Sequence, residues 1–202
     1  MDSPRQHRPS LRTRLRVWRA RFSAPAMLAV ADEKRVVSAL TAAHGGLAIA
    51  VISLCAWLTD LPMLFPALGP SAFIVFARPF SEAAIPRSVV VGHGAALMIG
   101  LAVRCTIEAL SGEQIGLAAT DTLPTLLSAS VALACTCFAL VRLSAPHAPA
   151  CATAIIVAVG AVRGWSGLFA MAAAVALLTL LAVGVNRLAG LCVPKWGASP
   201  DN

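Results

Sequence analysis

Four long apolar runs decide the fold class of this chain. The first, Val36 to Leu58, contains no Asp, Glu, Lys or Arg, and the others cover residues 88–107, 123–141 and 165–185. About 20 consecutive apolar residues form a helix long enough to cross a hydrocarbon core of about 30 Å. Charged residues make up only 12% of the chain, against about 25% in soluble domains. We therefore expect an all-α, multi-pass transmembrane helical bundle in contact with the lipid bilayer.

Positive charge is concentrated before the first apolar run. Nine of the 16 Lys and Arg residues lie in residues 1–35, which is typical of a cytoplasmic anchor under the positive-inside rule and not of a nucleic-acid-binding arm. Within this segment apolar residues recur at helical spacing, which predicts either a basic helix on an anionic bilayer surface or a disordered basic tail. These apolar residues are Leu11, Leu15, Trp18 and Phe22. We divide the chain into a basic cytoplasmic segment 1–35, a transmembrane domain 36–187 and a short cytoplasmic tail 188–202.

Two further apolar segments are too irregular to form one regular helix each. Segment 63–77, "MLFPALGPSAFIVFA", has prolines and a glycine in its first half, and segment 147–162, "HAPACATAIIVAVGAV", starts with a histidine between two prolines. If both segments cross the membrane, Arg78, Arg87 and Arg142 lie on the same side as the basic N-terminal segment, and the acidic loop expected at 108–122 lies opposite. The charge distribution favours these six crossings, with both termini cytoplasmic, over re-entrant segments.

The order long, broken, long occurs twice along the chain. "SAFIVFA" (71–77) aligns with "TAIIVAV" (153–159), and "ALMIGLAV" (96–103) aligns with "ALLTLLAV" (176–183). Because each unit has an odd number of crossings, the second unit is expected to be inverted relative to the first. This is the plan of many secondary transporters, in which discontinuous helices meet near the bilayer midplane and hold the substrate there. We expect a binding site where the two broken segments meet.

The two breaks provide candidate substrate-binding groups. Gly69 permits close approach of the backbone, Pro70 suits an early helical position, and Ser71 and Thr153 carry hydroxyls that we expect beside free N–H groups of a first helical turn. A helix N-terminus carries about half a positive charge and unsatisfied donors, so it favours an anion. Two such termini facing each other predict a site for a small inorganic anion.

Two histidines and an arginine complete the candidate substrate-binding set. His147 can donate a hydrogen bond to the anion or carry a proton with it; alternatively, it caps the turn at the cytoplasmic edge. His93 lies within an apolar run, where an ionisable group is costly and usually faces the interior of the bundle. Arg87 starts a span and attracts anions, or is an ordinary positive-inside charge. Arg104 and Glu108 are spaced for a local helical pair.

Signatures of catalysis and metal binding are missing from the sequence. There is no nucleophile elbow, Walker loop or HExxH pair, and the acidic residues fall in expected loops or span ends. The six cysteines lie in or beside apolar runs, so we interpret them as small apolar side chains. We therefore expect no enzyme activity, catalytic residue, metal or cofactor.

Residues 67–100, "ALGPSAFIVFARPFSEAAIPRSVVVGHGAALMIG", and 147–154, "HAPACATA", resemble the HPP family of integral membrane proteins, named for a His-Pro-Pro motif. Ala148 stands where the first proline of that motif belongs, and Cys151 where a glycine is usual. The resemblance covers about residues 36–187. It implies a multi-pass membrane protein, commonly described with four membrane-spanning helices, and its plant chloroplast members are associated with nitrite transport.

Two functions follow as expectations. The first is a transporter or channel of the inner cell membrane for a small inorganic anion, with nitrite as the first candidate, and with a homodimer as a geometric expectation. The second is a noncatalytic membrane module that partners or regulates another protein. Nucleic acid is not an expected partner of either.

Overall fold

The computed structural model describes residues 23–28, 32–116, 122–194 and 196–197, and every regular element in these ranges is a helix. Four helices are long and apolar enough to cross a membrane. They are α3 (Glu33–Thr59), α5 (Pro86–Ser111), α6 (Leu123–Arg142) and α8 (Gly164–Leu188). The predicted all-α, multi-pass bundle is confirmed. The expected basic helix before residue 23 lies outside the described residues.

The boundaries of the long helices follow from local chemistry. At the start of α3 the carboxylate of Asp32 accepts a hydrogen bond from the N–H of Arg35, which satisfies a donor that the helix leaves free. The α5 helix starts at Pro86 and ends at Ser111, and it is capped by Gly112, whose φ of 72° suits glycine. The loop that we expected from residue 108 therefore starts four residues later, and Glu108 is helical.

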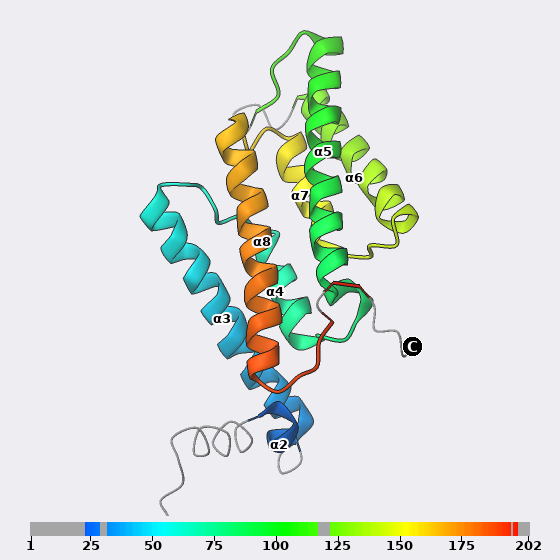
Figure 1. Cartoon of the computed structure of the whole chain (residues 1–202). Coiled ribbons are helices and arrows are strands. Elements are labelled where there is room, and N and C mark those ends of the chain that lie inside the picture. Colours follow the sequence, from blue (N-terminus) through cyan, green and yellow to red (C-terminus); the bar gives the residue numbers. More distant parts are fainter. Residues whose placement is uncertain (1–22, 29–31, 117–121, 195, 198–202) are drawn as a thin grey trace, which may run out of the picture.

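Two short helices accompany the long ones. They are α4 (Leu68–Ala77) and α7 (Pro149–Ala158), of ten residues each, so each is about 15 Å long, half of a hydrocarbon core. Figure 1 shows that α3 and α5 run in the same direction, so the segment between them, which contains α4, returns across the bundle. The α7 segment does the same between α6 and α8. Four full-length helices and two half-length helices thus account for six passages.

The two halves of the chain are inverted copies, as the sequence predicts. In Figure 1, α3 and α5 point up and α4 points down, whereas α6 and α8 point down and α7 points up. The third helix of each copy packs with the first two helices of the other copy. Buried residues of α8 pack with α3 and α4 around Ile52, Leu68 and Leu178, and those of α5 pack with α6 and α7 around Ala96 and Ala154. The N-terminal ends of α4 and α7 consequently lie at the centre of the bundle.

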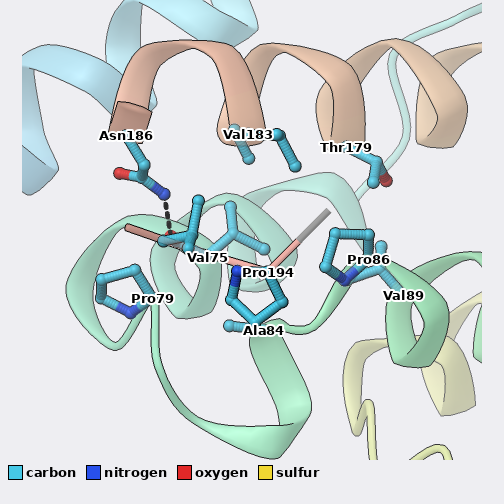
Figure 2. Close-up of a pocket in the computed structure, with 11 residues that line it drawn as sticks. Val75, Pro79, Ala84, Pro86, Val89, Thr179, Val183, Asn186 and Pro194 are labelled. Carbon is cyan, nitrogen blue, oxygen red and sulfur yellow. Dashed lines mark hydrogen bonds between the residues drawn. The ribbon is translucent and has the colours of Figure 1, made fainter. Parts of the chain in front are cut away.

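The remaining short elements lie at one end of the bundle. They are α2 (Ala24–Leu28) and the 3₁₀ turn η1 (Glu82–Ala84). At this end Asn186 of α8 donates a hydrogen bond to the carbonyl of Val75 of α4, at 2.9 Å. Figure 2 shows this bond beside a narrow cavity of about 10 Å³ between α8 and the Pro79, Pro86 and Pro194 rings, with room for about one water molecule.

Candidate functional site

Ser71, in the first turn of α4, joins the two histidines of the candidate set. Its Oγ lies 3.1 Å from Nε2 of His93 and 3.0 Å from Nε2 of His147. It also lies 2.8 Å from the carbonyl oxygen of Ala67, one turn earlier in the chain. The three side chains are buried, with at most 1% of their surface exposed. The structure therefore brings residues from three separate segments to one hydroxyl.

Thr153 extends the cluster along α7. Its Oγ1 lies 2.8 Å from Nδ1 of His93, and its side chain is buried as well. His93 comes from α5, so this helix contributes the ring that bridges α4 to α7. Buried polar side chains in a membrane protein are costly unless they are paired. In this cluster both ring nitrogens of His93 have a partner.

His147 occupies the turn that leads into α7, between Pro146 and Pro149. Its Nδ1 lies 2.7 Å from the carbonyl oxygen of Ala83 in η1. Pro149 takes the first helical position of α7, where its missing N–H costs nothing. The ring of His147 is buried and faces Ser71, so it is not a solvated side chain at the cytoplasmic edge, although its Nδ1 does bond to the η1 turn.

Small residues make room for the His147 ring. A Cβ added at Gly92 would lie 3.3 Å from Cβ of His147 and 3.3 Å from a methyl carbon of Leu140. The glycine before His93 therefore allows the turn before α7 to pack against α5. The rings of His93 and His147 lie 5.0 Å apart and are tilted by 57° to each other. We refer to Ser71, His93, His147 and Thr153 as the central cluster.

Three residues of the candidate set lie outside the central cluster. Gly69 and Pro70 are exposed, and a Cβ added at Gly69 would meet nothing within 4 Å, so close backbone approach is not what this glycine provides. Arg87 donates to the carbonyl oxygens of Ser144 and Leu143 at 2.9 and 3.0 Å. A cation at this place satisfies carbonyls just after the C-terminus of α6.

Backbone donors at the two helix starts are already used. The N–H groups of Gly69 and Ser71 donate to Pro66 and Ala67, and those of Ala150 and Cys151 donate to His147 and Ala148. The expectation that the hydroxyls lie beside free N–H groups is therefore wrong for these positions. A ligand in the central cluster would be held by imidazole and hydroxyl groups, with the two helix dipoles adding a positive potential.

Two carbonyl oxygens of the site left no signal in the sequence. Ala67 and Ala83 take part through their main chains, so their side chains do not indicate the role.

The expected pair of Arg104 and Glu108 is also wrong. Arg104 donates to the carbonyl of Val162, just beyond α7, at 3.0 Å, and Glu108 accepts from the N–H of Ile115, also at 3.0 Å.

A cavity lies at the N-terminal end of α5. It has a volume of about 240 Å³ and is lined by Glu82, Ile85, Arg87, Ser88 and Ser144. Glu82 immediately precedes Ala83, whose carbonyl accepts the hydrogen bond from His147. The cavity, with Arg87 on its wall, therefore lies at the same end of α5 as the turn to which His147 is bonded.

Comparison with known proteins identifies the family. No curated protein and no solved structure matches the chain. The family described as HPP, transmembrane region, matches residues 25–194, which include every described helix from α3 to α8 and the whole central cluster. The chain therefore belongs to the HPP family of membrane proteins.

Proposed function

We propose that this protein transports a small inorganic anion and that the central cluster is its binding site. The carrying observation is that four buried polar side chains, from α4, α5, α7 and the turn before α7, form one cluster where two inverted half-helices begin. His93 and His147 both contact Ser71, and Thr153 contacts His93. Polar groups at membrane depth are costly, so their concentration in one place favours a functional role. Discontinuous helices that meet at the centre of inverted repeats are typical substrate sites.

The chemistry of the cluster favours an anion over a cation. Imidazole N–H and hydroxyl groups donate hydrogen bonds, and within the part of the chain that the structure describes no carboxylate bonds to either ring. The N-terminal ends of α4 and α7 add positive potential at the same place. Nitrite is the first candidate because of the association of the family's chloroplast members with nitrite transport.

Burial of the cluster favours a transporter over an open channel. The four side chains have less than 2% of their surface exposed, so a ligand reaches them only when the surrounding helices move. In transporters with inverted repeats, one part of the bundle rocks against the other around a fixed central site. The polar cavity at the N-terminal end of α5 is then the route from one side of the membrane.

Charge placement supports an inner-membrane protein with both termini in the cytoplasm. The start of α3, the end of α4 and the segment after α8 meet at one end of the bundle, where Glu33, Arg78 and Leu191 line a shared cavity of about 320 Å³. The N–H of Arg87 bonds to the carbonyl of Trp196 at this end. Glu108 lies in the last turns of α5 and Glu113 just beyond its end, at the other end of the bundle. The basic end is the cytoplasmic one under the positive-inside rule.

Flux into liposomes tests the proposal. Purified protein should raise uptake of nitrite, or of another small anion among nitrate, chloride and formate, above that of protein-free liposomes. Ser71→Ala should lower this uptake, whereas Ser53→Ala should not, because the hydroxyl of Ser53 bonds only to the carbonyl of Ile49 in its own helix. Wild-type uptake equal to the protein-free background for all four anions would refute the proposal.

A further inference from the structure

The hydroxyl of Ser71 has more partners than hydrogens. Its Oγ lies within hydrogen-bond distance of the carbonyl of Ala67 and of Nε2 of both His93 and His147. A carbonyl oxygen only accepts, so the Ala67 contact is a hydrogen bond only when Ser71 donates to it. A serine hydroxyl has one hydrogen. Whether the two histidines donate or accept therefore decides whether all three contacts are satisfied.

The partner of Nδ1 determines which ring nitrogen of neutral His147 carries the hydrogen. Nδ1 lies 2.7 Å from the carbonyl of Ala83, so Nδ1 carries a hydrogen and donates it. In a neutral ring Nε2 is then bare and requires the hydrogen of Ser71. His93 is satisfied when the Thr153 hydroxyl donates to its Nδ1 and its Nε2–H donates to Ser71. In this state the carbonyl of Ala67 receives no hydrogen from the Ser71 hydroxyl and keeps only the hydrogen bond from the Ser71 backbone N–H.

One additional proton satisfies every contact. With a hydrogen on Nε2 of His147, both imidazoles donate to Ser71, and Ser71 turns its own hydrogen to Ala67. No heavy atom has to move, because the distances of 3.0, 3.1 and 2.8 Å suit both arrangements. If the extra proton were on His93 instead, Nε2 of His147 and the carbonyl of Ala67 would both require the single hydroxyl hydrogen of Ser71. The geometry thus selects His147 as the proton acceptor.

We propose that a proton is the co-substrate of this transporter and that it binds at Nε2 of His147. Its binding changes a contact of α4, because the Ser71 hydroxyl then donates its hydrogen to the carbonyl of Ala67 and no longer to His147. This inference rests on the proposed anion transport. In the step itself the Nε2 lone pair binds a proton from one side of the membrane, and the proton leaves on the other side. Nothing is oxidised or reduced.

The charges around His147 explain why proton and anion travel together. The elements around the ring carry few charged or titratable side chains. They include His93, Arg87 and Arg104 on α5, Arg78 at the end of α4, Glu82 on η1, Cys137 and Arg142 on α6, and Cys151 on α7. Glu82, the carboxylate on η1, is exposed and does not bond to either ring.

A protonated His147 would therefore be a buried cation between two positive helix ends, which is unfavourable by itself. A monoanion in the same site neutralises it. Burial of either ion alone is costly, and burial of the pair is much less so. The expected transport is one proton with one monovalent anion, and no net charge crosses the membrane.

Separate control of pH and voltage tests the inference. Wild-type protein in liposomes is given nitrite, and in parallel nitrate, whose strong conjugate acid does not cross bilayers unaided. Potassium and valinomycin set the voltage, and buffers set the pH difference. The protein-dependent initial rate should rise when the outside is made acidic at zero voltage, and it should not change when the voltage alone is changed. A rate that follows voltage and ignores pH would overturn proton coupling but leave anion transport intact. No protein-dependent flux would overturn both.

Variants at Ser71 and His147 separate coupling from folding. Ser71→Ala should lower the pH-driven rate at least about tenfold, as expected for loss of a hydrogen bond to a charged group. Ser53→Ala is the matched control for loss of a helical hydroxyl. If Ser71→Ala does not elute as a folded protein, His147→Gln replaces it, since its amide still donates to Ser71 but does not titrate. A full pH-driven rate in a variant that lacks the titratable ring would refute the inference.

Discussion

Ser71 and His147 are 76 positions apart in sequence, yet the Oγ of one lies 3.0 Å from Nε2 of the other. The two residues belong to opposite repeats, one in the first turn of α4 and one just before α7. Their contact holds the starts of the two half-helices together at the centre of the bundle. Any movement that opens the site between the repeats must break or rearrange this hydrogen bond, so substrate binding and helix movement share one contact.

Thr153→Val should impair transport and stability together. Valine keeps the shape of the side chain but leaves Nδ1 of the buried His93 without a donor, which costs about 1–3 kcal/mol. We expect a lower melting temperature in detergent and a flux reduced about tenfold, as a loss of roughly 1.4 kcal/mol in the transport step implies. Thr179→Val is the control, because its hydroxyl bonds to Val175 within α8. Wild-type flux in Thr153→Val would remove Thr153 from the site.

Gly100→Ala should destabilise the protein by about 1–3 kcal/mol. The added Cβ would lie 2.6 Å from the carbonyl oxygen of Ala154, so α5 and α7 would have to separate. Gly94→Ala on the same helix meets nothing within 4 Å and should be neutral or stabilising, because alanine is the better helix former. Thermal unfolding of both variants in detergent measures the difference. Equal melting temperatures would contradict the close packing of α5 on α7.

The hydropathy pattern and the helix-breaking residues predicted most of the fold. The four long apolar runs became the spanning helices, and the prolines around Gly69 and His147 marked the two breaks. The inverted order followed because three passages per repeat reverse the second copy. The ends were less accurate. The charge of Glu108 suggested a loop, but the carboxylate accepts from the N–H of Ile115 and the helix continues to Ser111.

The site was predicted in part. Ser71, His93, His147 and Thr153 stand out because polar residues are rare in apolar runs, and the structure brings these four together. Gly69 and Pro70 were chosen from their conformational roles, which shape the chain without placing a residue at the site. The carbonyls of Ala67 and Ala83 could not be predicted, since main-chain acceptors are present at every residue and only tertiary structure selects among them.

Arg104→Met should destabilise the C-terminal end of α7. The guanidinium donates to the carbonyl of Val162 at 3.0 Å, next to the end of that helix, where a cation contributes up to about 2 kcal/mol. Arg142→Met, at an exposed position in the last turn of α6, is the control and should change stability by less than about 0.5 kcal/mol. Unfolding in detergent measures both. An unchanged melting temperature for Arg104→Met would show that this contact contributes nothing.

Cys137 and Cys151 should form a disulfide under an added oxidant. Their sulfur atoms lie 3.8 Å apart, between α6 and the first turn of α7. Copper phenanthroline with oxygen would accept the two electrons, and the two thiol protons would be released. Peptide mass spectrometry should find the linked pair in wild-type protein and in Cys135→Ser, but not in Cys137→Ser. A link between Cys135 and Cys151 instead would mean that α6 is rotated relative to this structure.

Single-cysteine labelling should place the two ends of α5 on opposite sides of the membrane. Ser81 lies just before this helix and Glu113 just after it, and a helix of 26 residues is about 39 Å long, more than a hydrocarbon core. In a background with all native cysteines replaced by serine, Ser81→Cys should react with a membrane-impermeant maleimide only from the cytoplasm, and Glu113→Cys only from outside. The reverse assignment would invert the topology and place the basic end outside. Labelling of both from one side would exclude α5 as a spanning helix and, with it, the six-passage arrangement that places Ser71 and His147 at the centre.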